Sequence, residues 1–303
     1  MQATSTARPF TTKKEFYAQF KKKSLAQELW LRFLKNKTAV AGLVIIGVIV
    51  AVAIAAPWIA NYDDVVIKMD IGARLQRPSA AHWFGTDELG RDILARMVYG
   101  ARVSLVIGIS AIFVSLMVGL VLGGAAGYYG GKTDSIIMRA MDVFLSLPDV
   151  LLALAIIAAF GNTKLNLTIA IGLSFAPKFS RVVRSAVMGV RDNEYIEAAR
   201  SIGARDNRII ARHVLPNCIG PIIVQVTLYV ANAILTIAAL SFIGLGIQPP
   251  APEWGNMLAS GRTFMRDYPH IVVAPGLAIF FTILALNLLG DGLRDTLDPR
   301  LKH

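Results

Sequence analysis

The amino-acid sequence predicts an all-α, polytopic membrane protein, and three observations support this prediction. Hydrophobic residues make up 55% of the 303 residues, whereas only 17% are charged. Four long runs contain no Asp, Glu, Lys or Arg: residues 39–60, 103–131, 214–252 and 271–290. About 20 consecutive apolar residues are enough for a helix to cross a bilayer. Together these features exclude a disordered chain, a small disulfide-stabilised domain and a soluble enzyme.

Six transmembrane helices are expected from these runs and from two shorter ones between them. The expected spans are residues 39–60, 103–126, 142–160, 165–179, 220–243 and 271–289. The fourth span is short, but Lys164 and Lys178 at its ends can extend their side chains to the two interfaces. Because 38 mostly polar residues precede the first span, it does not resemble a cleavable signal peptide and is expected to remain as a helix.

The second span carries a glycine at every fourth position towards its end. These residues are Gly119, Gly123, Gly127 and Gly131. Small residues at this spacing allow two helices to approach closely. The span is therefore expected to present a glycine ridge to a neighbouring helix.

The distribution of positive charge predicts the orientation. With six spans and a cytoplasmic N-terminus, 22 of the 31 Lys and Arg residues face the cytoplasm, and without the fourth crossing only 13 would do so. Cytoplasmic loops of membrane proteins are rich in Lys and Arg, so six crossings with both termini in the cytoplasm are expected. The expected parts are a basic cytoplasmic segment 1–38, an N-terminal helix 39–60, an extracytoplasmic loop 61–102 and the five remaining spans in 103–303. No aromatic residues interleave with a basic patch, so the net charge of +11 does not indicate nucleic acid as a partner.

The cytoplasmic segment 181–217 is long enough to hold structure of its own. Asp192 or Asn193 can cap a helix, and Gly203 stands where a left-handed residue would end it. One apolar stripe is predicted along this helix, made of Tyr195, Ala198, Ala199 and Ile202. A second helical stretch over 206–214 is expected to end before Pro216. Periodicity alone leaves two interpretations open, a helix lying on anionic lipid and a helix that docks into a partner protein.

The residues of this segment favour docking. Glu197-Ala198-Ala199 is followed after three residues by Gly203 and then by Leu215-Pro216. This pattern resembles the EAA loop of the permease subunits of ABC importers, in which the short helix contacts an ATPase subunit. The resemblance assigns coupling to Tyr195, Glu197, Ala198, Ala199, Ile202, Gly203, Leu215 and Pro216.

Further motifs resemble one branch of this family, the second, C-type permease of dipeptide, oligopeptide and nickel importers. They are Phe84–Asp87, Gly90–Asp92, Ala126–Gly131, Gln248–Pro250, Pro252–Gly255 and Asn287–Asp295. The resemblance implies a five-helix importer core preceded by one additional N-terminal helix. It also implies a non-catalytic subunit of the bacterial inner membrane that imports di- or oligopeptides, with nickel or another small solute as the alternative.

The same resemblance implies the partners. A homologous permease would complete the translocation path, two cytoplasmic ATPases would bind ATP and Mg, and an extracytoplasmic protein would deliver the peptide. This chain itself is expected to bind no cofactor. The outer loop 244–269 is expected to contact the binding protein and form an outer gate, with Trp254 as an anchor at the membrane interface. The gate residues are Gln248, Pro249, Pro250, Glu253 and Trp254.

Polar residues elsewhere give weaker indications. Glu88 and Asp92 are spaced to pair with Arg91 and Arg96 along a helix capped by Thr86 or Asp87, which is a simpler interpretation than a metal site. A single cysteine and four dispersed histidines give no reason to expect zinc.

One carboxylate and two conspicuous amides within the expected spans form a possible intramembrane site: Asp149, Asn232 and Asn287. Asp149 is either functional or simply hydrogen-bonded to a neighbouring helix. A secondary transporter remains a rival class, but it would require several midplane charges and inverted repeats.

Overall fold

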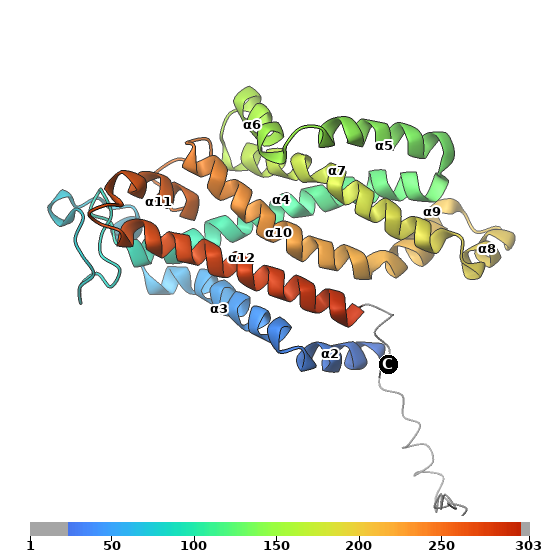
Figure 1. Cartoon of the computed structure of the whole chain (residues 1–303), viewed down its shortest axis with the longest axis horizontal. Coiled ribbons are helices and arrows are strands. Elements are labelled where there is room, and N and C mark those ends of the chain that lie inside the picture. The colour runs from blue at the N-terminus through green and yellow to red at the C-terminus, as the bar shows by residue number, and fades with distance from the viewer. Residues whose placement is uncertain (1–23, 298–303) are drawn as a thin grey trace, which may run out of the picture.

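The computed structural model describes residues 24–297, and these residues form helices and loops without a named β-strand. The all-α prediction is confirmed for this part of the chain. The long helices lie side by side along one axis (Figure 1). One end of the bundle carries the short helix α11, Trp254–Gly261, and the other carries the short helix α8, Glu194–Ser201. We refer to these as the α11 end and the α8 end.

Helices α2 and α3 are joined at a single residue. Helix α2, Leu25–Lys35, begins with a capping box between Ser24 and Gln27. Asn36 ends α2, and its side chain accepts hydrogen bonds from the first amides of α3, Lys37–Ile59. The Asn36 amide also donates to Asp295, 3.2 Å away near the end of the last helix. Helix α3 contains the first expected span almost in full.

Two short turns, Tyr62–Val66 and Ile71–Ala73, lead to helix α4, Ile93–Tyr129. The predicted glycine ridge packs α4 against α7, Lys164–Arg191. A Cβ added to Gly119, Gly123 or Gly127 would lie 2.2–2.8 Å from atoms of α7, so only glycine permits this approach. Gly131 does not belong to the ridge, because α4 ends at Tyr129 and Gly130 takes a φ of +64°.

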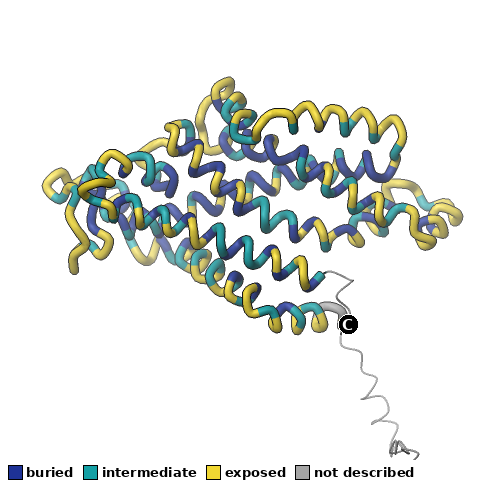
Figure 2. The backbone as a smooth tube through the Cα atoms, in the orientation of Figure 1, coloured by how far each residue is buried: buried dark blue, intermediate teal, exposed yellow. Residues whose placement is uncertain are grey.

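The expectation of one helix over 142–160 is wrong. Helix α5, Gly131–Leu145, and helix α6, Asp149–Phe160, are separated by three residues and bent by 86°. Pro148 precedes α6, and its ring prevents the backbone from continuing α5 unbroken. Helix α5 lies along the outside of the bundle and is mostly exposed, as Figure 2 shows. Met141 is its one buried residue.

The fourth and fifth expected spans belong to longer helices. Helix α7 continues through Pro177 to Arg191, so the segment expected from residue 181 begins as the last turns of α7. Helix α9, Asp206–Ile209, continues through a π turn, Ile210–Val214, and a 3-10 turn, Leu215–Cys218, into α10, Ile219–Phe242. The expected helix end before Pro216 is therefore wrong. Pro216 lies in the first positions of the 3-10 turn, where its missing N–H is tolerated.

The chain then forms α11 and a 3-10 turn, Arg262–Phe264, before the last helix, α12, His270–Leu297. Length and hydropathy identify four helical segments of the described part as candidate membrane spans: α3, α4, residues 206–242 and α12. The bent α5–α6 pair makes a fifth if it counts as one span. Helix α7 does not qualify because its second half is rich in Arg and Lys. The structure is thus multi-spanning, with four or five candidate spans.

Close packing explains the glycines of the Asn287–Asp295 motif. A Cβ on Gly290 would lie 2.8 Å from the Leu228 side chain of α10, and one on Gly292 would lie 2.1 Å from Ala39 of α3. The motif therefore holds α12 against both helices.

Two hydrophobic clusters form the interior. The larger one reaches from the α11 end to the middle of the bundle and draws on α3, α4, α6, α7, α10, α11 and α12. The second lies at the α8 end, and we call it the α8-end cluster. Its buried members are Tyr128, Val183, Val187, Ile196, Ala199, Ile209, Val214, Cys218 and Ile222.

Candidate functional site

The α8 helix begins and ends as its sequence predicts. Asn193 occupies the N-cap position in an extended conformation, although its side chain makes no capping hydrogen bond. Gly203 takes a φ of +79°, which confirms the expected left-handed residue. The amide of Ala204 donates to the Ala199 carbonyl at 3.1 Å and closes the helix end. A Cβ at Gly203 would meet nothing within 4 Å, so backbone conformation rather than space favours glycine here.

The two faces of α8 differ in their surroundings. Ile196 and Ala199 are buried in the α8-end cluster. Tyr195 and Ile202 are 45% and 85% exposed. Ala198 and Glu197 are exposed as well. The predicted stripe is therefore divided, because Ala199 anchors the helix to the bundle while the other three members face outward.

The end of α4 contacts the α8 region through polar groups. The Tyr128 hydroxyl donates to Asp206 at 2.7 Å, and Arg200 of α8 donates to the same hydroxyl at 3.5 Å. Arg191 donates to the Gly127 carbonyl at 2.8 Å. Sequence reasoning did not find these contacts. The only signal was the Ala126–Gly131 motif, whose role the sequence did not reveal.

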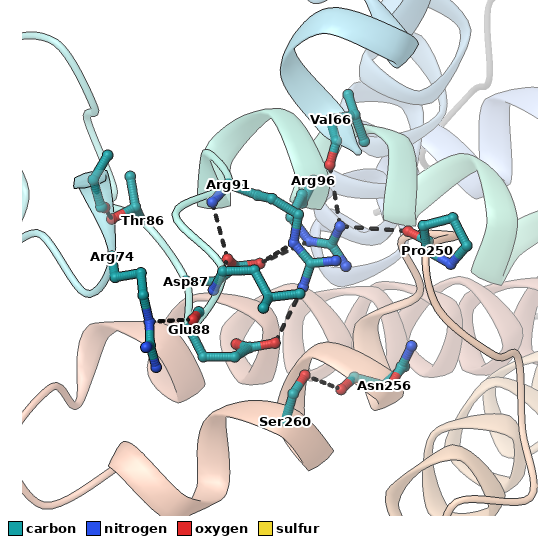
Figure 3. A network of polar contacts seen from close by, with 12 residues as sticks. Val66, Arg74, Thr86, Asp87, Glu88, Arg91, Arg96, Pro250, Asn256 and Ser260 are labelled. Atoms are coloured by element: carbon teal, nitrogen blue, oxygen red, sulfur yellow. Dashed lines mark hydrogen bonds and ion pairs between the residues drawn. The ribbon is translucent and has the colours of Figure 1, made fainter. Parts of the chain in front are cut away.

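The α11 end contains a group of charged residues that we call the Arg96 cluster: buried Asp87, Arg91 and Arg96 and half-buried Glu88 (Figure 3). The Arg91 Nε donates to Asp87 at 2.7 Å, and Arg91 also reaches Glu88 at 3.1 Å. The Arg96 Nε lies 3.3 Å from Asp87. The expected pairing of arginines with acids is confirmed for Glu88 and Arg91, but Arg96 pairs with Asp87 rather than Asp92.

The helix that carries these residues begins later than expected. Asp92, rather than Thr86 or Asp87, caps α4 by accepting from the Ala95 amide at 2.8 Å. Asp92 also contacts His82 at 2.9 Å. Residues 85–91 form a turn instead of a helix, since Gly85 and Gly90 both have positive φ. The pairing of Arg91 is therefore made across a turn.

Arg96 connects three segments that are distant in the sequence. It donates to the Val66 carbonyl at 3.1 Å and to the Pro250 carbonyl at 3.4 Å (Figure 3).

Within residues 24–297, the buried Arg91 Nη1 has no hydrogen-bond partner. No group of three or more His, Cys, Asp or Glu side chains in the described part of the chain is arranged to hold a metal.

The expected gate residues separate into two groups. Gln248, Pro249 and Pro250 are exposed. Glu253 and Trp254 are buried. Glu253 caps α11 by accepting from two backbone amides, and the Trp254 indole donates to the Met97 carbonyl at 3.0 Å.

Trp254 is not an anchor at the membrane interface, so that expectation is wrong. Its indole lies against Gly100 of α4, where an added Cβ would be 2.8 Å away. Because Gly100 has no side chain, the indole ring of Trp254 can pack in the core.

Two of the three residues of the possible intramembrane site have a local hydrogen-bond or ion-pair partner. Asp149 forms an ion pair with Lys178 of α7, which supports the simpler interpretation, a contact with a neighbouring helix. The Asn232 amide donates to the Leu228 carbonyl of its own helix at 2.9 Å. Asn287 is half-buried on α12. The structure does not bring these three residues together by any contact that it describes.

Comparison with known families agrees with this arrangement. Residues 119–303 match the family of binding-protein-dependent transport system inner membrane components. Residues 24–78 match the N-terminal TM domain of oligopeptide transport permease C. The chain belongs to this transport family. The resemblance identified from the sequence motifs is thereby confirmed, and with it a multi-pass protein of the inner membrane.

Curated relatives of this permease family cover nearly the whole chain. It is 47% identical to the dipeptide transport system permease protein DppC of Alkalihalophilus pseudofirmus over 91% of this chain and 90% of that protein. It is 46% identical to the di/tripeptide transport system permease protein DppC of Pseudomonas aeruginosa, covering 91% and 93%. It is 45% identical to the glutathione transport system permease protein GsiD of Pectobacterium atrosepticum, covering 91% of each chain.

The family fold also appears in a solved structure. An inward-facing conformation of the MetNI methionine ABC transporter contains a chain that aligns with a TM-score of 0.57 at 16% identity. The alignment covers 68% of this chain and 98% of that chain. This likeness supports the permease fold and says nothing about substrate.

Proposed function

We propose that this chain is a membrane-spanning permease subunit of an ATP-driven importer for di- and oligopeptides. The observation that carries the proposal is α8, a short helix with one face buried in its own bundle and an outward face containing Tyr195, Ala198 and Ile202. An exposed apolar face on a rigid base fits a docking site for another protein. The peptide substrate is supported by the names of relatives that share 46–47% of their residues with this chain.

Energy for import would come from two partner ATPases that bind ATP and Mg, while this chain performs no catalysis. The outward face of α8, together with Glu197, would dock on one of them. Movement of the docked helix would then move the spans as rigid bodies. Gly203 fixes the end of α8, and Leu215 and Pro216 lie in the turn that leads to α10.

A second, homologous permease would complete the path. A cleft of about 580 Å³ opens between α7 and the start of α10, lined in part by Arg181, Ser185 and Asn217. A second cleft of about 430 Å³ shares Val182 and Pro221 with it and continues towards α12. Both clefts are open on one side, which fits a path closed by another chain. Gln248, Pro249 and Pro250 would face a binding protein at the opposite end of the bundle.

The proposed topology has six crossings: the five candidate spans, with the bent α5–α6 pair counted as one, and α7. Both termini would lie in the cytoplasm. The excess of Lys and Arg on one side supports this orientation. A cysteine at Asn207 or at Gln248, in a Cys218→Ser background, tests it in intact cells with an impermeant thiol reagent. Labelling is expected at 248 and not at 207. Labelling at 207 would contradict the proposed orientation.

The coupling role of α8 is tested by Gly203→Val with Gly47→Val, at an exposed position of α3, as the matched control. An added Cβ meets nothing within 4 Å at either glycine, but only Gly203 has a positive φ. A β-branched residue at Gly203 meets a backbone penalty of about 1–2 kcal/mol, too little to unfold a bundle of long helices. It is expected to change how α8 ends and to displace Glu197 and Ala198 on the ATPase.

The measurement is dipeptide uptake beside ATP hydrolysis in proteoliposomes that contain the whole complex with its binding protein. Gly203→Val is expected to assemble but to lose uptake and the stimulation of hydrolysis by loaded binding protein. Gly47→Val is expected to behave as the wild type. Full uptake with normal stimulation in Gly203→Val would show that α8 is not the coupling element, and a lipid-surface helix would then be favoured.

A further inference from the structure

The end of α4 carries the Ala126–Gly131 motif. The coupling role proposed for α8 does not explain this motif. Tyr128 is the buried residue that α4 contributes to the α8-end cluster. Its ring lies among apolar side chains, while its hydroxyl donates to Asp206 at 2.7 Å. Asp206 is the first residue of α9, five residues after the last residue of α8. The contact therefore joins α4 to the turn that follows α8.

Arg200 approaches the same tyrosine from α8 itself. Its guanidinium lies 3.5 Å from the hydroxyl oxygen, and its central carbon lies 5.8 Å from the ring centroid. Tyr128 is thus contacted from both sides of the α8–α9 turn. We call Tyr128, Arg200 and Asp206 the Tyr128 latch.

The latch connects segments that the chain does not join directly. Tyr128 is 72 residues from Arg200 and 78 from Asp206, whereas the α8 segment is joined by peptide bonds to α7 and α10. Helix α4 also contacts α7 closely along its glycine ridge. A movement of α8 delivered to the end of α4 would therefore move two long, tightly packed helices together.

We propose that the Tyr128 latch transmits the movement of α8 to α4, with Tyr128 as a positioning residue. This proposal rests on the proposed coupling role of α8. The apolar contacts of Ile196 and Ala199 hold α8 against the bundle but have no fixed direction. A hydrogen bond from a hydroxyl to a carboxylate is directional and stronger than a neutral one. The latch is thus the contact that would fix how α4 follows α8.

The test compares Tyr128→Phe with Tyr129→Phe in the reconstituted complex. Both variants remove one hydroxyl from adjacent tyrosines, but Tyr129 is 53% exposed and makes no contact with Asp206 or Arg200 among those described. Dipeptide uptake and ATP hydrolysis are measured in the same proteoliposomes. Tyr128→Phe is expected to lower the uptake per ATP hydrolysed by at least about tenfold, the factor that one hydrogen bond to a charged group represents. Tyr129→Phe is expected to keep the wild-type ratio.

The ratio separates transmission from stability, because a merely destabilised subunit would lower uptake and hydrolysis together. Asp206→Ala is expected to reproduce the loss, and Asp206→Asn, which keeps an acceptor oxygen but not the charge, is expected to lose less coupling than Asp206→Ala. The double variant Tyr128→Phe/Asp206→Ala should be no worse than either single variant, since both remove the same bond. Additive losses would overturn the latch.

The remaining outcomes are also decisive. A wild-type ratio in Tyr128→Phe, with uncoupling in Gly203→Val, would overturn the latch and leave the function of α8 intact. Wild-type ratios in both would overturn the coupling role of α8 and the latch with it. Should Tyr128→Phe fail to assemble, Asp206→Ala provides the same test, because Asp206 is exposed and lies outside the apolar cluster.

Discussion

Charged residues join helices in two regions of this protein, and the two regions differ in burial. In the Arg96 cluster, the paired Arg96 and Asp87 side chains are 2% and 6% exposed. Between α5–α6 and α7, three ion pairs form what we call the α5–α7 ladder: Asp134–Arg184, Asp142–Arg181 and Asp149–Lys178. In its middle pair, the side chains of Arg181 and Asp142 are 56% and 54% exposed. The same chemistry therefore operates in two environments.

Burial changes what such a pair contributes. Removing one partner of a buried pair leaves an uncompensated charge, whereas an exposed pair is screened by solvent and contributes little. The Arg96 cluster also ties α4 to the carbonyls of Val66 and Pro250, so several segments depend on it. The ladder holds α5, whose one buried residue is Met141. The difference teaches that buried pairs hold the α11 end, whereas α5 is held to α7 by pairs that are partly or largely exposed.

The largest effect is expected for Arg96→Met at the α11 end. The substitution leaves Asp87 buried without one of its cations and releases two carbonyls, so the free energy of unfolding should fall by about 3–5 kcal/mol. Chemical denaturation in detergent micelles measures this change. Arg102→Met is the control, because Arg102 lies on the same helix and is exposed. Equal effects of the two substitutions would remove the distinction between the regions.

A comparable loss is expected at the same end for Trp254→Ala. The indole packs against Gly100 and donates to the Met97 carbonyl, so the substitution leaves a cavity and removes this hydrogen bond. Truncation of a buried tryptophan lowers the free energy of unfolding by about 3–5 kcal/mol. Trp58→Ala serves as the control, since Trp58 is 83% exposed on α3. A negligible change at Trp254 would mean that α11 does not depend on this contact.

The smallest effect is expected in the α5–α7 ladder. Asp142→Asn removes the charge of an exposed pair, and the free energy of unfolding should change by about 0–1 kcal/mol. A double-mutant cycle with Arg181→Gln measures the interaction of the two residues directly. The same cycle on Asp87 and Arg96 should give a much larger interaction. A coupling of several kcal/mol in the ladder would break the comparison and make α5 a fixed element.

Features that depend on neighbouring residues in the chain were predictable from the sequence. The apolar runs predicted the long helices, the glycine spacing predicted the ridge of α4, and the position of Gly203 after an amphipathic stretch predicted the left-handed end of α8. The motif spacing around Glu197 and Pro216 identified the transport family, which the family comparison confirmed. Each of these signals lies within about 20 residues, the scale on which periodicity and capping act.

Other features depended on which segments meet in space. Local spacing could not predict three of these contacts. They are the bond of Arg96 to Pro250, 154 residues away, the burial of Trp254 against α4, and the bond of Tyr128 to Asp206. The bend between α5 and α6 is different, because a local signal, Pro148, marks the helix break and the prediction from hydropathy did not use it. The sequence by itself determined the all-α class, most of the long apolar helices and the family. Only the tertiary structure decided which polar side chains are buried and paired, because burial and pairing are properties of the neighbours that packing brings together.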